Sequence, residues 1–294
     1  MNKLTELFCD VDDFCKAFIP EWEKQLLEEG TRKRRRQGRM SMSEILTLII
    51  SFHCSNHRDF KNFYKGYVSR FYKQHFPQLL SYTRFLEVMP QALVPLCSYF
   101  ITLKGKPTGI EFIDSTTLSV CHNIRIPRHK TFEGVAQRGR STMGWFYGFK
   151  LHLIVNYKGE IVAAKLTAGN VHDTKPVLEL AEGLTDKLYG DKGYISKALE
   201  SSLFEKGVKL VTNVRRNMKP KALSIWDRVM LSKRFIIETI NDQLKNISQI
   251  EHSRHRSIHG FMLNLMAGLV AYCLKDNKPT LNINDVEFNA IVNA

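Results

Sequence analysis

The sequence predicts an α/β protein in which an all-helical N-terminal domain (1–105) precedes a mixed five-stranded sheet with flanking helices (106–275) and a polar C-terminal tail (276–294). Two observations lead to this prediction. Helical periodicity runs through the first part without β alternation, and short β-branched segments begin after the linker LKGKPTG (103–109). The later order is three strands, helix, strand, helix, strand and helix. That order is typical of a sheet that is antiparallel at its start and parallel later.

Helical patterns in the N-terminal part cover residues 42–54, 59–76 and 81–103. Ser41 or Ser43 is the expected N-cap of the first of them, because a serine hydroxyl can accept from the orphan backbone N–H groups. Pro90 and Pro95 are expected to kink or break the third.

Short β-branched or aromatic runs predict the strands, and NYKG forms a hairpin between the second and the third. The expected strands are residues 110–120, 145–155, 160–167, 187–191 and 208–214; the expected helices are 173–184, 196–207, 233–246 and 261–274. Ser196 is a natural N-cap and Gly207 a natural stop for the second of these helices.

Composition narrows the class of protein. The 294 residues include 43 Lys and Arg against 29 acidic residues, a net charge of +14, which favours a polyanionic partner such as nucleic acid or an anionic membrane surface. No apolar run reaches 18 residues, so no membrane span is expected. The acidic N-terminus lacks a signal-peptide pattern, and the scattered cysteines indicate reduced thiols in a cytosol.

The helix KRFIIETINDQLKN (233–246) has an unusual polar face. At about 100° per residue, Arg234 and Lys245 lie within about 40° of Glu238. The opposite face is apolar and consists of Ile236, Ile240, Leu244 and Ile247. A glutamate between two cations can simply form i,i+4 ion pairs on a solvent-exposed helix face, or it can belong to a functional site. The second interpretation requires other carboxylates that could lie next to Glu238.

Two aspartates supply such carboxylates. Asp114 follows the apolar half of its strand, and Asp191 ends the very short strand KLYGD. Each could merely cap a turn. The carboxyl ends of strands in an α/β sheet are, however, where ligand crevices form. Together with Glu238 the two aspartates could bind two divalent metal ions, a pair that activates a nucleophile for phosphoryl displacement.

In the segments around these three acidic residues, the sequence resembles the DDE transposases of bacterial insertion sequences, which have a ribonuclease H-like catalytic core. FIDST resembles the first-Asp motif, YGDKGY the second, and RFIIETINDQLKN the third, with Arg, Glu and Lys in the family's order. The likeness covers roughly residues 105–275. One departure is Leu231, since such families commonly have a tyrosine three residues before the arginine.

The resemblance implies a transposase that binds terminal inverted repeats, cleaves at the 3′ ends and joins the freed 3′ hydroxyl to target DNA. It implies Asp114, Asp191 and Glu238 as catalytic metal ligands and two Mg²⁺ ions, for which Mn²⁺ can substitute. Double-stranded DNA is the expected partner, with a homodimer at synapsis, no membrane, and a cytoplasmic, nucleoid-associated location in a bacterium.

Cationic side chains are the expected DNA contacts, because phosphates position a protein on the duplex. They are Arg32, Lys33, Arg34, Arg35, Arg36, Arg138, Arg140, Arg234, Lys245, Arg254 and Arg256, with His172 and Lys192 near the carboxylates. For the basic run 31–39 a solvated linker is the alternative, and for His172 a helix-capping loop. A ribonuclease H-like nuclease that cuts without joining, or a non-catalytic DNA-binding derivative, are the rival functions.

Overall fold

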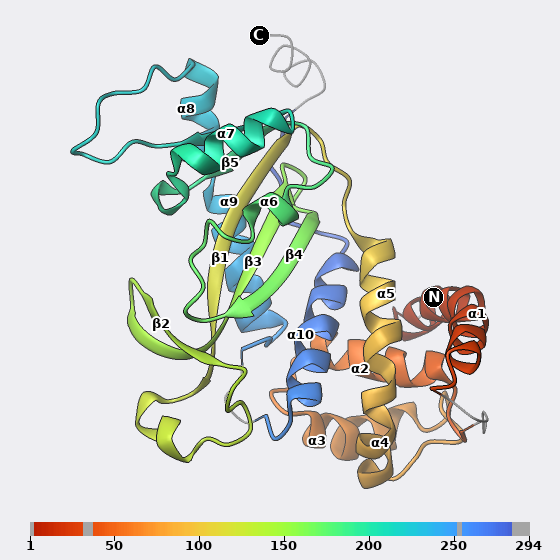
Figure 1. The fold of residues 1–294 in the computed structure, drawn as a ribbon. Helices are drawn as coiled ribbons and strands as arrows, with labels where there is room; N and C mark the ends of the chain where they lie inside the picture. The colour runs from red at the N-terminus through yellow and green to blue at the C-terminus, as the bar shows by residue number, and fades with distance from the viewer. Residues whose placement is uncertain (1–2, 32–37, 252–254, 284–294) are drawn as a thin grey trace. The chain divides into compact units, whose positions relative to one another are not determined.

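A six-stranded mixed sheet forms the centre of one of the two units into which the chain divides (Figure 1). The structure is a computed structural model and describes residues 3–31, 38–251 and 255–283. The first unit contains the residues up to Leu103 with 246–250 and 256–274. The second contains Lys104–Lys245, Glu251–His255 and the residues from Lys275 onward.

The first unit is helical in its described residues. Its elements are α1 (Lys3–Glu28), α2 (Met42–Cys54), α3 (Phe60–Asn62), the π-helix η1 (Phe63–Tyr72), α4 (Tyr82–Val88), the 3₁₀ helix η2 (Met89–Ala92), α5 (Leu93–Leu103) and α10 (Ile258–Cys273). Ser41 is confirmed as the N-cap of α2: its hydroxyl accepts from the Glu44 N–H at 3.1 Å, and the Glu44 carboxylate accepts from the Ser41 N–H at 2.7 Å.

Pro90 interrupts the α-helix of the third segment, as predicted, because α4 ends at Val88 and the 3₁₀ helix η2 separates it from α5, but the chain stays helical from Tyr82 to Leu103. Pro90 stands at the start of η2 and Pro95 in the first turn of α5, where a missing N–H is tolerated. The helical run Tyr82–Leu103 is therefore long and apolar enough to cross a membrane by length and composition alone, with 28% of its most apolar window buried. No such segment is expected from the sequence, in which no uninterrupted apolar run reaches 18 residues. One helix of this kind is weak evidence, since core helices pass the same test.

Helix α10 packs on α5 and α2 in the helical unit, whereas the sequence placed it in the catalytic domain. It is apolar on nearly all sides, with buried residues from Phe261 to Tyr272. Gly268 permits close approach, since a Cβ there would lie 2.3 Å from Ile250 Cγ2. A helix without a polar face needs partners all around it, and the N-terminal helices provide them.

The second unit contains the sheet. Its strands are β1 (Ile110–Cys121), β2 (Gln137–Ser141), β3 (Gly144–Asn156), β4 (Ile161–Ala168), β5 (Asp186–Gly190) and β6 (Val208–Thr212). Its helices are η3 (Asn123–Arg128), α6 (Val177–Leu180), η4 (Lys192–Tyr194), α7 (Lys197–Glu205), α8 (Ile225–Ser232), α9 (Phe235–Asp242) and the π-helix η5 (Gln243–Ile247). β1 pairs antiparallel with β3 and parallel with β5, and β4 also pairs with β3. The predicted α/β class with a mixed sheet is confirmed.

The predicted number of five strands was wrong, because β2 adds a sixth. Its sequence QRGRS carries no alternating apolar pattern, so the usual strand signal is absent. β2 pairs with the first residues of β3, next to the stretch that pairs with β4. Gly139 is required there, since a Cβ would lie 2.1 Å from the carbonyl oxygen of Gly169.

Helices cover both faces of the sheet. Ile113, Leu188 and Leu210 point to one face and join the core that α6 and α7 complete. Because side chains alternate along a strand, Asp114 and Tyr189 point to the other face. There the Tyr189 hydroxyl donates to the carboxylate of Asp227 in α8 at 3.0 Å, and α9 packs on β1. Figure 1 shows α6 in front of the sheet and α9 behind it.

Candidate active site

The register of β1 and β5 sets Asp114 and Asp191 side by side. The two parallel strands pair up to Phe112 opposite Tyr189, and the aspartates stand two residues beyond that pair. Adjacent strands are about 4.8 Å apart, and a two-residue step returns a side chain to the same face. Both carboxylates are therefore directed to the face that α9 covers.

The local sequence ends β5 at Gly190, directly before Asp191. Gly190 leaves room for the Tyr194 ring, because a Cβ would lie 3.1 Å from Tyr194 Cδ2 and 3.2 Å from Ile113 Cγ2. Asp191 Oδ1 accepts from the Gly193 N–H at 2.7 Å and so caps η4. The turn-capping alternative is thus correct for Asp191, and the same hydrogen bond orients its carboxylate at the end of the strand.

Helix α9 brings Glu238 to this end of the sheet. Ile236, Ile237 and Ile240 are buried, while the side chain of Glu238 is 62% exposed. One turn after Glu238, Asn241 donates its side-chain amide to Asp114 Oδ2 at 3.1 Å. The sequence analysis assigned no role to Asn241, although its spacing of three residues from Glu238 places it on the same side of the helix.

Electrostatics show that the three carboxylates influence one another. Burial, the largest cause, and the negative charges of Asp191 and Glu238 together raise the pKa of Asp114 to about 6. A backbone hydrogen bond at Ser115 and the charge of Arg234 oppose the shift. Asp114 thus occupies a partly desolvated position that disfavours its own charge unless positive charge is near.

The two flanking cations of the third motif have different partners. Arg234 lies 3.7 Å from Glu238 and is 16% exposed, whereas Lys245 pairs with Glu251 at 3.0 Å. Ile247 was predicted to be buried and is 50% exposed. The π-helical turn η5 explains both differences, because its extra residue per turn rotates Lys245 and Ile247 away from the face that an ideal α-helix gives them.

Polar residues also gather on the opposite face of β1. Ser115 donates to Asp173 Oδ1 at 3.0 Å, and Lys150 pairs with the same atom at 2.9 Å. Asp173 contributes, with Asp114 and Asp191, to a raised pKa of the Tyr194 hydroxyl, for which burial is the first cause. The HD pair after the third strand is the sequence signal for this cluster, but the residue that belongs to it is Asp173 and not the predicted His172.

His172 itself is exposed, and its ring bonds the Thr174 hydroxyl at 2.8 Å. It does not cap α6, whose N-cap is Pro176 without a side-chain hydrogen bond. Lys192 is exposed directly after Asp191. Arg138 and Arg140 are exposed on β2, and Arg256 is exposed in the helical unit. Six of the predicted DNA contacts lie outside the described residues: Arg32, Lys33, Arg34, Arg35, Arg36 and Arg254.

Metal-binding geometry is not preformed in the described part of the chain, where no three His, Cys, Asp or Glu side chains form a group that could hold an ion. The donor chemistry nevertheless fits a hard cation. The available groups are carboxylates, and the side-chain oxygen of Asn241 is buried beside Asp114 without a hydrogen-bond partner.

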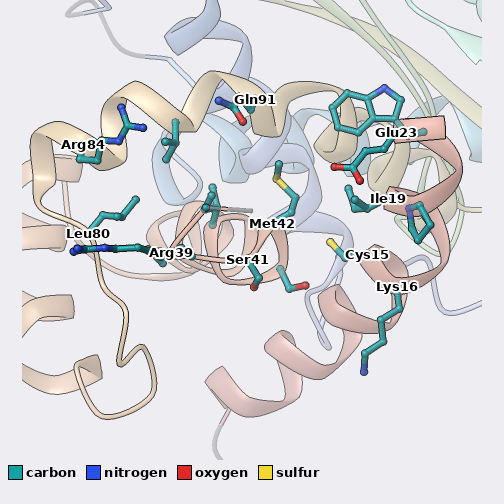
Figure 2. Close-up of a pocket in the computed structure, with 17 residues that line it drawn as sticks. Cys15, Lys16, Ile19, Glu23, Arg39, Ser41, Met42, Leu80, Arg84 and Gln91 are labelled. Atoms are coloured by element: carbon teal, nitrogen blue, oxygen red, sulfur yellow. The ribbon is translucent and has the colours of Figure 1, made fainter. Parts of the chain in front are cut away.

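A separate cavity of about 630 Å³ lies in the helical unit (Figure 2). Cys15 and Met42 line it together with Arg39 and Arg84. Burial raises the pKa of the Cys15 thiol to about 11, so the thiol is not activated for chemistry. None of the predicted catalytic residues lines this cavity.

A match to one protein family identifies the class of this chain. No curated protein matches the sequence. Among solved structures, the cryo-EM structure of a piggyBac transposase synaptic complex with hairpin DNA is similar over 92% of this chain and 72% of that chain, with 12% identity and a TM-score of 0.48. A family described as "Transposase DDE domain" matches residues 104–258, which include Asp114, Asp191 and Glu238. Because this match covers more than half of the sequence, the chain belongs to the DDE transposase family.

Proposed function

We propose that this transposase is an insertion-sequence enzyme that binds the terminal inverted repeats of its element, cleaves DNA there and joins the ends to a target. One observation carries the proposal: Asp114 in β1 and Asp191, directly after β5, lie two residues beyond the last pair of two adjacent parallel strands, on the face where α9 presents Glu238. Three carboxylates from β1, β5 and α9 are the arrangement that metal-dependent phosphoryl transfer requires.

Asp114, Asp191 and Glu238 would hold two Mg²⁺ ions, for which Mn²⁺ can substitute. When bound, such ions supply a deprotonated nucleophile and stabilise the leaving oxygen. The raised pKa of Asp114 supports the fit, since a cation would offset the desolvation and the repulsion from Asp191 and Glu238. Glu238 is 62% exposed and has only a 3.7 Å ion pair with Arg234, so it can turn toward the aspartates, whereas Asp114 and Asp191 are oriented by hydrogen bonds.

The roles proposed for Arg234 and for the other basic residues follow from their positive charge. Arg234, on the turn before Glu238, acts on Asp114 and helps keep it ionised. A chain with a net charge of +14 attracts DNA phosphates over its surface, which the three acidic groups alone would repel. We expect cleavage to begin with attack of water on a phosphodiester, which frees a 3′ hydroxyl for attack on the target strand.

The test uses Asp114→Asn, Asp191→Asn and Glu238→Gln in the full chain. Each substitution nearly keeps the volume and removes one charge. We expect cleavage and joining of pre-cut ends to fall below detection in Mg²⁺ or Mn²⁺, while DNA binding survives. Glu182→Gln, an exposed acid after α6, is the matched control and should retain activity.

The outcomes separate the rival functions. Cleavage without joining of pre-cut ends would indicate a nuclease. Binding without either reaction in the unaltered chain would indicate a non-catalytic derivative. Normal joining by the Glu238→Gln protein would overturn the assignment of the third carboxylate.

A further inference from the structure

The hairpin formed by β2 and β3 carries large apolar side chains into solvent. Met143, in its two-residue turn, is 96% exposed, and Trp145 is 58% exposed. Burying side chains of this size is favourable, so their exposure marks a contact surface when they occur together. Figure 1 shows β2 at the end of the sheet unit where this hairpin projects.

The hairpin tip is held in shape by its own polar groups. The Ser141 hydroxyl accepts from the Met143 N–H at 3.2 Å and donates to the Gly144 carbonyl oxygen at 3.2 Å. Asn123 donates to the Trp145 carbonyl oxygen at 2.7 Å. The exposed side chains are therefore presented on an ordered turn, which lowers the entropy lost when they bind.

Cations surround the apolar tip. Arg140 pairs with Trp145 across the strands and lies over its ring at 5.9 Å, and Arg138 shares that face. Between residues 122 and 145 there are five Lys and Arg against one acidic residue, Glu133. An apolar centre with a basic border is complementary to nucleic acid, where base faces lie between phosphates.

We propose that this hairpin is a DNA wedge: Met143 enters an unstacked base step, Trp145 stacks on an exposed base, and Arg138 and Arg140 contact the adjacent phosphates. The proposal deepens the proposed function by naming how this unit binds DNA. Proteins that distort the duplex insert apolar side chains in this way, and aromatic rings stack on bases without sequence preference.

The wedge acts away from the reacting phosphate. Asp114 pairs with Leu153, eight positions along β3 from Trp145, which is roughly 26 Å at about 3.3 Å per residue. The hairpin therefore takes no part in the chemistry. Its contact lies on the order of eight base pairs from the cleaved bond, at about 3.4 Å per base pair.

Binding to a mismatched duplex tests the wedge without knowledge of the inverted repeats. The full chain is titrated, without divalent metal, against a duplex of about 30 base pairs, roughly 100 Å long, and against the same duplex with two central mismatches. Mismatches remove part of the cost of unstacking, so the unaltered chain should bind the mismatched duplex roughly tenfold more tightly. Met143→Ala and Trp145→Ala should lose this preference and keep the affinity for the matched duplex.

Three controls make the result specific. Phe204→Ala removes another exposed aromatic side chain, 75% exposed on α7, and should keep the preference. Arg138→Ala should weaken binding to both duplexes alike and lower the salt dependence. A 2-aminopurine beside the base step that Met143 enters should brighten as it unstacks on binding of the unaltered chain and not on binding of Met143→Ala.

Other outcomes overturn the wedge. They are an equal affinity of the unaltered chain for both duplexes, an unchanged preference in Met143→Ala and Trp145→Ala, or a loss of preference in Phe204→Ala. If Met143→Ala and Trp145→Ala keep the DNA preference but no longer bind phosphatidylserine vesicles, the hairpin tip contacts a membrane. If they keep the DNA preference but no longer self-associate in light scattering, the tip contacts a second copy of the chain. Because no step needs catalysis, the wedge and the proposed function can fail separately.

Discussion

Asn241 of α9 donates a hydrogen bond to the carboxylate of Asp114 in β1, with 3.1 Å between Nδ2 and Oδ2. This contact links the helix that carries Glu238 to the strand that carries the first aspartate. Asn241 is 6% exposed, so the hydrogen bond is shielded from water and fixes the distance between the two elements.

Replacement of Asn241 should therefore affect the site more than the fold. We expect Asn241→Ala to cost about 1 kcal/mol of unfolding free energy, because one hydrogen bond is lost at a buried position. Strand transfer should fall at least tenfold and require more Mg²⁺, since Glu238 is no longer held in register with Asp114. Urea unfolding and a Mg²⁺ titration of joining measure the two effects. An Asn241→Ala protein with wild-type metal dependence would show that the hydrogen bond is only structural.

Arg234 should control the pH dependence of activity. Its charge lowers the pKa of Asp114, which burial and two neighbouring carboxylates raise to about 6. Arg234→Ala removes the lowering contribution, so the pKa of Asp114 should rise. The acidic limb of the pH–rate profile should then move to higher pH, since more base is needed to ionise the aspartate. Lys233→Ala, at an exposed neighbouring position, is the control and should leave the profile in place.

Lys245 should be coupled to Glu251 and not to Glu238. The pair lies at 3.0 Å with both side chains largely buried, and Glu251 also accepts from the Ser119 N–H at 2.8 Å. A double-mutant cycle of Lys245→Ala and Glu251→Ala should give a coupling energy of about 1 kcal/mol in thermal or urea unfolding. The cycle of Lys245→Ala with Glu238→Gln should be additive. Coupling in the second cycle would show that Lys245 lies beside Glu238, as an ideal α-helix predicts.

The carboxylates of the candidate site could be predicted from the sequence, whereas several packing contacts could not. Asp114 and Asp191 could be found because each follows a short apolar strand segment, and the parallel pairing of the two segments brings both residues to the same place, although β1 continues beyond Asp114 to Cys121. Glu238 could be found from helical periodicity. The same periodicity misplaced Lys245 and Ile247, because nothing in the sequence announces the π-helical turn that begins at Gln243.

Contacts between elements that are far apart in the chain are harder to predict from sequence patterns than the carboxylates are. The all-round apolar pattern of α10 predicts burial but cannot say which neighbours cover it, and the helix packs with α2 and α5. β2 lacked an apolar pattern altogether, since an edge strand with one solvated face can be polar. Asn241 was missed for a similar reason: a single amide in a helix becomes informative only when its partner on another strand is known.

The packing of α10 on α2 and α5 affects whether the N-terminal region can fold without the rest of the chain. A fragment ending at Lys104 would lack α10 and expose the apolar faces of α2 and α5 that the helix covers. We expect it to melt without a cooperative transition, whereas the full chain melts cooperatively. Differential scanning calorimetry distinguishes the two, and cooperative melting of the fragment would show that α10 is dispensable. DNA binding by the basic run 31–39 should therefore be measured in the full chain.

Glu111 should make stability depend on pH. The side chain is fully buried on β1; its Oε1 accepts from the N–H groups of Thr108 and Gly109 at 2.5 and 3.0 Å, and its Oε2 has no partner. Burial raises its pKa from an ordinary value of 4.5 to about 7, although these hydrogen bonds oppose the shift. The folded state thus binds the proton more tightly than the unfolded state. The stabilisation is complete below about pH 4.5 and is lost as the pH rises through about 7.

Glu111→Gln keeps the shape and the accepting oxygen but cannot ionise. We expect its unfolding free energy to exceed that of the unaltered chain at pH 8 by an amount on the order of 2 kcal/mol, and to differ little at pH 5. Asp114 titrates in the same window with the same sign, so the slope of the unaltered chain is not wholly removed. Glu182→Gln should leave the slope unchanged, because that side chain is exposed. If Glu111→Gln and the unaltered chain show the same pH dependence in urea unfolding, the buried carboxylate is ionised throughout and the hydrogen bonds at Thr108 and Gly109 outweigh its desolvation.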